Sequence, residues 1–87
     1  MSLVEFERML AALLPSPGAV ALTITELPER DDHLFGIVQS ALLLGRRLQS
    51  QLTEVHAPRE RMAALSGRFA DLRIDEGSGV LRLVFEG

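Results

Sequence analysis

Two histidines, His33 and His56, are the only side chains of this 87-residue chain whose type ordinarily changes charge near neutral pH. His33 follows Asp31 and Asp32, so one short run offers an imidazole and two carboxylates, the groups that bind divalent metal ions. One hypothesis is therefore a metal site at His33. The alternative is a capping turn at the start of a helix that leaves the imidazole exposed.

The residue types give little support for a catalytic nucleophile or for a cysteine-based site. The chain has no Cys, which excludes disulfides, thiolate metal ligands and Cys nucleophiles. Ser78 lies between Gly77 and Gly79, but a turn between two strands is not the strand-to-helix turn that presents a catalytic Ser. We expect a protein that is not an enzyme and has no cofactor.

A long helix over residues 33–55 is the main structural expectation. Apolar and small residues recur there at alternating spacings of four and three, typical of a coiled-coil seam: Leu34, Val38, Ala41, Gly45, Leu48, Leu52 and Val55. Through Leu44 the apolar face is too wide for a chain of this size to cover alone. We expect these residues to form the interface of a homodimer. A monomeric core helix is the alternative.

Gly45 falls on this seam and costs helix stability relative to Ala. Either a close approach of another helix or a kink would explain it, and the sequence leaves both open.

Shorter elements surround this helix. The patterns predict a helix over residues 3–14, a strand over 19–27 that Pro28 ends, and a short helix over 58–67. Alternating residues then predict a β-hairpin of strands 70–75 and 80–85, joined by a four-residue loop. In this register Ile74 faces Leu81 and Leu72 faces Leu83.

The expected fold is an α+β domain in two layers, with the order α-β-α-α-β-β and helices on one face of a three-stranded sheet. The other sheet face would be open and would carry Ala21, Thr23, Thr25, Asp71, Arg73, Asp75, Arg82 and Val84. Residues 1–87 form a single domain in this interpretation. Residues 1–3 and 86–87 are typical of additions from an expression vector.

Arginine supplies all nine basic side chains, and it suits phosphate recognition. The alternative function is therefore a nucleic-acid-binding module that uses four residues near the second and third helices: Arg46, Arg47, Arg59 and Arg61. The net charge of −3 argues against a general polyanion binder. Arg73 and Arg82 would face each other across the hairpin, where they could bind a carboxylate of a partner. Arg46 and Arg47 on the long helix are further possible contacts for a partner or an anion.

A phosphoacceptor is a further alternative for His33. A His on a long self-pairing helix is similar to the dimerisation helices of histidine kinases, here in the run Glu29-Arg30-Asp31-Asp32-His33-Leu34. The resemblance implies phosphorylation of His33. An acidic residue usually follows the His in that family, whereas Leu34 follows it here.

These patterns together favour a non-enzymatic protein-interaction module that self-associates through the helix over residues 33–55. The partner is another protein of unknown identity, with nucleic acid as the less favoured ligand. No signal peptide is visible, and the apolar runs are far shorter than a membrane span. We therefore expect a cytoplasmic protein.

Overall fold

The computed structural model describes residues 3–14 and 18–87 and confirms an α+β fold. In these residues the chain order is α-β-α-β-α-β-β. The elements are α1 (Leu3–Leu13), β1 (Ala19–Ile24), α2 (Asp31–Arg47), β2 (Gln51–Ala57), α3 (Arg59–Arg68), β3 (Arg73–Glu76) and β4 (Leu81–Glu86). Residues 1 and 2, two of the expected vector additions, lie outside the described part, whereas Glu86 is the last residue of β4. No described helix has the length and apolar character needed to cross a membrane.

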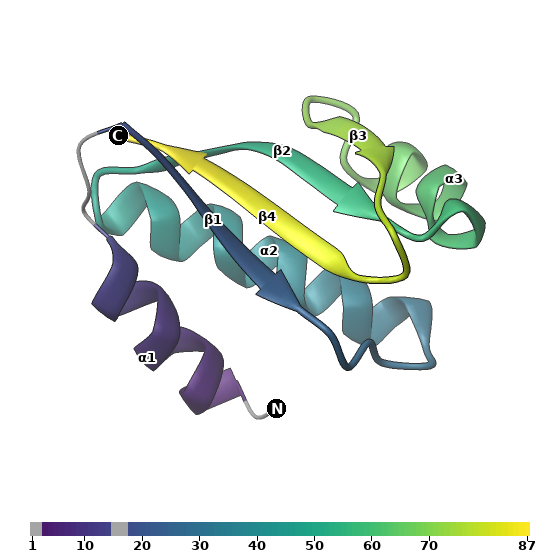
Figure 1. Ribbon diagram of the computed structural model, residues 1–87, viewed down its shortest axis with the longest axis horizontal. Coiled ribbons are helices and arrows are strands. Elements are labelled where there is room, and N and C mark those ends of the chain that lie inside the picture. The colour runs from purple at the N-terminus through teal and green to yellow at the C-terminus, as the bar shows by residue number, and fades with distance from the viewer. Residues whose placement is uncertain (1–2, 15–17) are drawn as a thin grey trace.

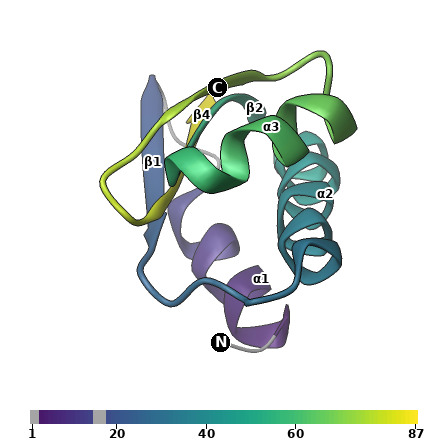
Figure 2. The same ribbon diagram turned by 90° about the vertical axis from the view of Figure 1, so that its right-hand side faces the viewer.

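The sheet has four strands in the order β1-β4-β2-β3, so the prediction of three strands was wrong (Figure 1). β4 is antiparallel to both of its neighbours, whereas β2 and β3 are parallel and are joined through α3. The helices lie together on one side of the sheet, as two views of the ribbon show (Figures 1 and 2). This is the expected two-layer arrangement, with the second face of the sheet left open.

The predicted helix over residues 33–55 was wrong in its second half. α2 ends at Arg47, and residues 51–57 form β2 instead. The helix ends in a Schellman motif, in which the Ser50 N–H donates to the Gly45 carbonyl (2.8 Å) and the Gln49 N–H to the Arg46 carbonyl (3.2 Å). Gln49 takes the left-handed conformation (φ 62°) that Gly usually supplies at this position. The chain therefore reverses within three residues that carry no Gly or Pro signal.

The predicted hairpin was also wrong, although both of its strands exist. β3 pairs with β2, where Ile74 faces Val55, and β4 pairs with β1 and β2. Leu81 and Leu83 point into the core as expected, but Leu81 lies opposite Ile24 rather than Ile74, and Leu83 lies between Leu22 and Val55 rather than opposite Leu72. Alternation along a strand determines which side chains face the core, and it does not determine which strand lies alongside.

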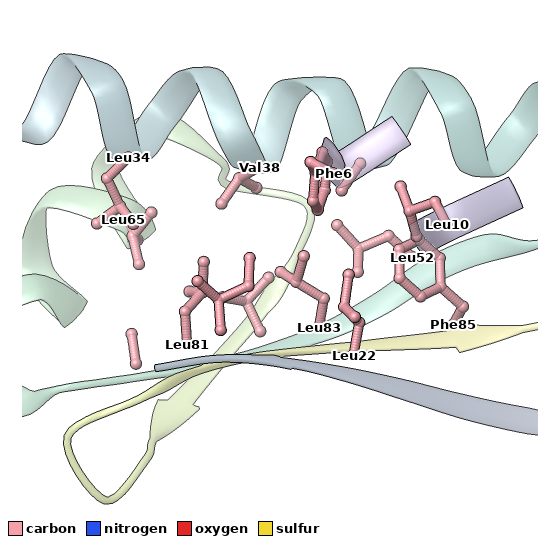
Figure 3. Close-up of a cluster of buried hydrophobic side chains, with 14 of the residues drawn as sticks. Phe6, Leu10, Leu22, Leu34, Val38, Leu52, Leu65, Leu81, Leu83 and Phe85 are labelled. Carbon is pink, nitrogen blue, oxygen red and sulfur yellow. The ribbon is translucent and has the colours of Figure 1, made fainter. Parts of the chain in front are cut away.

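One apolar core fills the space between the helices and the sheet (Figure 3). Side chains from α1, α2, α3 and the strands point toward one another there, including Phe6, Leu10, Leu22, Leu34, Val38, Leu52, Leu65, Leu81, Leu83 and Phe85. A bulge at Thr53 interrupts the pairing of β2 with β4. It lets Leu52 and Val55, three residues apart, both point inward.

Gly45 marks a close approach, which answers the question that the sequence left open. A Cβ atom at this position would lie 2.6 Å from the Ser50 carbonyl oxygen and 3.2 Å from the Phe85 ring. The neighbours are the turn into β2 and a side chain of β4, not a second helix. α2 therefore rests directly on the sheet at the point where the chain reverses.

Two glycines of α2 should respond to the same substitution in opposite ways. Gly45→Ala should lower the free energy of unfolding by about 1–3 kcal/mol, because overpacking against backbone outweighs the gain in helix propensity. Gly36→Ala is the matched control, since nothing lies within 4 Å of its added Cβ, and it should raise stability by about 0.5–1 kcal/mol. Urea unfolding followed by circular dichroism measures both. Equal stabilisation by the two variants would contradict the close approach at Gly45.

Candidate functional site

The open face of the sheet carries a block of polar side chains that the strand register arranges in two rows. Across the four strands one row is Thr23, Arg82, His56 and Asp75, and the next row is Ala21, Val84, Glu54 and Arg73. Six of the eight residues predicted for this face belong to these rows, and Glu54 and His56 join them from the unexpected strand β2. Opposite charges lie directly side by side at Glu54 of β2 and Arg73 of β3, which favours pairing across these two strands, whereas Arg82 of β4 lies beside His56 and not beside Arg73.

Four of these residues form a connected cluster on β2 and β3, named here the β2–β3 cluster: Glu54, His56, Arg73 and Asp75. The Arg73 guanidinium contacts both carboxylates, with Nη1 3.3 Å from a Glu54 oxygen and Nε 2.9 Å from an Asp75 oxygen. The His56 Nε2 atom lies 3.8 Å from the other Glu54 oxygen. One arginine thus neutralises much of the repulsion between two carboxylates on adjacent strands.

The three groups able to bind a metal in this cluster are partly shielded from water. Ligand atoms of Glu54, His56 and Asp75 lie within 4.8 Å of one another. The side chains of His56 and Glu54 are 23% and 30% exposed, whereas the Arg73 side chain is 71% exposed. The two β2 side chains are therefore held by their surroundings, and the arginine is the member with most freedom to move.

The run Asp31-Asp32-His33 is not assembled as a metal site. Asp31 accepts a hydrogen bond from Arg61, Asp32 forms an ion pair with Arg30, and His33 is exposed in the first turn of α2. His33 also lines a groove of about 590 Å³ between α1, the end of β1 and α2. Among the described residues, the group of three potential metal ligands that lie close together contains His56 and not His33.

The seven residues predicted as a dimer interface lie mostly in the core of the single chain. Six are buried, namely Leu34, Val38, Ala41 and Gly45 on α2 and Leu52 and Val55 on β2, and Leu48 between these elements is half-buried. Their apolar character is thus explained by packing within one chain. Among the described residues, the exposed face of α2 carries one large apolar side chain, Leu43.

The four arginines of the nucleic-acid alternative have different environments. Arg59 forms an ion pair with Glu76, and Arg61 is half-buried. The Arg61 guanidinium donates to the carbonyls of Pro28 (2.6 Å) and Glu29 (3.1 Å), which ties α3 to the loop before α2. Arg46 and Arg47 are exposed in the last turn of α2, where basic side chains interact favourably with the helix dipole.

Sequence reasoning missed the β2–β3 cluster because it placed Glu54 and His56 on a helix. On a strand these two residues, two positions apart, point to the same face, as Arg73 and Asp75 do on β3. The matching pattern of alternate polar residues was the available signal. To predict the cluster from this pattern, residues 51–57 would have to be assigned to a strand and that strand paired in parallel with β3.

The outer edge of β1 is a second distinctive surface, at the opposite end of the sheet from β3. β1 is an uncharged six-residue strand, Ala19-Val20-Ala21-Leu22-Thr23-Ile24, which pairs with β4 alone. In contrast, the edge strand β3 has four residues, of which three are charged. Short and charged edges resist pairing with another chain, and β1 has neither protection.

Comparison with protein-family models, curated proteins and solved structures finds no match to this chain.

Two arginines of α3 should differ in their effect on stability. Arg61→Ala should cost about 1–3 kcal/mol in the free energy of unfolding, because it removes charge-assisted hydrogen bonds to the loop over residues 28–31. Arg59→Ala should change stability by less than about 0.5 kcal/mol, since its ion pair with Glu76 is exposed. Thermal and urea unfolding measure both. Equal losses would show that Arg61 is not the residue that anchors this loop.

Proposed function

We propose that this domain is a non-enzymatic interaction module that forms a homodimer through the outer edge of β1. The observation that carries the proposal is an uncharged six-residue edge strand without a paired neighbour on its outer side in the described structure. Self-association was expected from the sequence, but the buried seam of α2 and β2 does not offer a surface for it. The edge of β1 offers one that needs no rearrangement of the core.

The pairing of β1 with β4 determines which backbone groups of β1 point outward. The Gly87 N–H donates to the Gly18 carbonyl (3.3 Å), so residues 18 and 87 form a hydrogen-bonded pair of the antiparallel ladder. Hydrogen-bonded pairs recur at every second residue. The N–H and C=O groups of Ala19, Ala21 and Thr23 therefore point away from β4 and are available to another strand.

A second copy of β1 fits this edge by symmetry. Two identical strands can pair in an antiparallel manner about a two-fold axis, so that the same patch serves both subunits. When Leu22 is placed opposite its own copy, Ala21 faces Thr23 of the partner on the open side, and no charge opposes a like charge. The product is a continuous eight-stranded sheet with the helices of both subunits on one side.

Exposed apolar side chains of α1 are a further candidate contact surface for the second copy. α1 shares the core cluster with Leu22 and Ile24 of β1, and its Met9 and Leu13 remain 38% exposed one helical turn apart. Burial of such side chains would add a hydrophobic contribution to the backbone hydrogen bonds.

A proline at the outer edge of β1 tests this proposal. Ala21→Pro removes an outward N–H while leaving the bonds between β1 and β4, so the fold should persist and the dimer should be lost. Ala21→Lys, which keeps the N–H and adds a charge, should weaken the dimer at least tenfold. Sedimentation velocity over a range of protein concentrations measures both, and circular dichroism checks that each variant is folded.

Leu43→Glu is the matched control, because Leu43 is the exposed apolar residue of α2 and lies on the far side of that helix from the sheet. It should leave the dimer unchanged. A wild-type chain that remains monomeric at high micromolar concentration would overturn the proposal. Loss of the dimer in Leu43→Glu but not in Ala21→Pro would move the interface to the helices.

A further inference from the structure

We infer that Glu54, His56 and Asp75 form a surface site for a divalent transition-metal ion such as Zn²⁺. The inference goes beyond the proposed dimer and does not depend on it. Two of the three residues alternate on β2, and the third lies on β3 directly opposite His56 in the parallel register. A pair of adjacent strands thus presents one imidazole and two carboxylates to the same side of the sheet.

The spacing of these groups is close to that of a bound ion. Metal bonds of 2.0–2.2 Å in a tetrahedral site place neighbouring ligand atoms about 3.4 Å apart. The Glu54 oxygen and the His56 Nε2 atom are 3.8 Å apart, and the ligand atoms of the set lie within 4.8 Å of one another. Side-chain rotations that shorten the longest of these distances by up to about 1.4 Å would complete the site without movement of the strands.

Arg73 shows that the site stabilises a positive charge. Its guanidinium lies between Glu54 and Asp75 and contacts both carboxylates. The Arg73 side chain is mostly exposed, so it can turn toward solvent when another cation takes its place. A metal ion would therefore compete with Arg73 for the same two carboxylates.

The donor set selects the class of metal. One imidazole nitrogen with two carboxylate oxygens suits Zn²⁺ and its neighbours better than Ca²⁺ or Mg²⁺, which prefer oxygen ligands alone. Three protein ligands leave coordination positions for water. Arg82 lies opposite His56 on β4 and adds a positive charge nearby, so we expect affinity in the micromolar range rather than that of a structural zinc site.

Titration with ZnCl₂ in a non-chelating buffer, followed by calorimetry, tests the site. The chain has no Cys and two His, which makes the matched control simple. Wild-type protein should bind one ion per chain, His56→Ala should weaken binding at least tenfold, and His33→Ala should leave it unchanged. Arg73→Ala should tighten binding severalfold, because it removes the competing guanidinium while keeping every ligand.

Opposite shifts in the Arg73 and His56 variants distinguish a metal site from a structural ion-pair network. Nuclear magnetic resonance gives an independent readout, since the imidazole signals of His56 should move with Zn²⁺ while those of His33 stay in place. No binding up to millimolar Zn²⁺, or binding that His33→Ala abolishes and His56→Ala spares, would overturn the inference. So would weaker binding by a folded Arg73→Ala variant. None of these results depends on whether the chain is a dimer.

Discussion

The close packing of Gly45 against the Ser50 carbonyl and the Phe85 ring is the constraint on which the arrangement of the sheet depends. Because no Cβ intervenes, α2 can end on the sheet, and the chain reverses through residues 48–50 directly into β2. β2 then lies beside β4, where Leu52 faces Phe85. Its other edge is left free for β3, which returns in parallel after α3. A side chain at position 45 would push α2 away from the turn into β2 and from the Phe85 ring of β4.

The central place of β2 also determines what the open face carries. The bulge at Thr53 keeps Leu52 and Val55 in the core while Glu54 and His56 point to the opposite side. The parallel pairing with β3 then sets Asp75 beside His56 and Arg73 beside Glu54. Glu54 and His56 thus meet Arg73 and Asp75 because β2 lies between β3 and β4, although no sequence motif connects the two pairs. The same order leaves β1, the least charged strand, at the outer edge.

Local pattern was sufficient to predict α1, α3, β1 and the inward faces of the predicted strands, although β1 ends at Ile24 and not at residue 27 before Pro28. It failed where two signals conflicted. Leu48, Leu52 and Val55 continue the helical spacing of α2, and Gln49 takes the left-handed conformation without the Gly that would announce a helix end. The predicted hairpin was wrong for a different reason. Alternation shows which face of a strand points inward but not which strand lies beside it, and most of residues 51–57 had been assigned to a helix and so were not considered as a partner for β3 or β4. Since Glu54 and His56 lie on β2, which was not predicted from the sequence, the β2–β3 cluster could not be predicted either.

The two proposed surfaces lie far apart on one sheet, which makes them physically independent. Strands are spaced about 4.8 Å apart, so in a dimer paired through β1 each β2–β3 cluster lies about three spacings from the two-fold axis. The two clusters would be separated by roughly 30 Å along the eight-stranded sheet, too far to share an ion. Each subunit would hold its own metal with its own ligands, and the open sides of both subunits would face the same way. A partner lying across the shared face would therefore meet two identical charged clusters, one toward each end of the sheet.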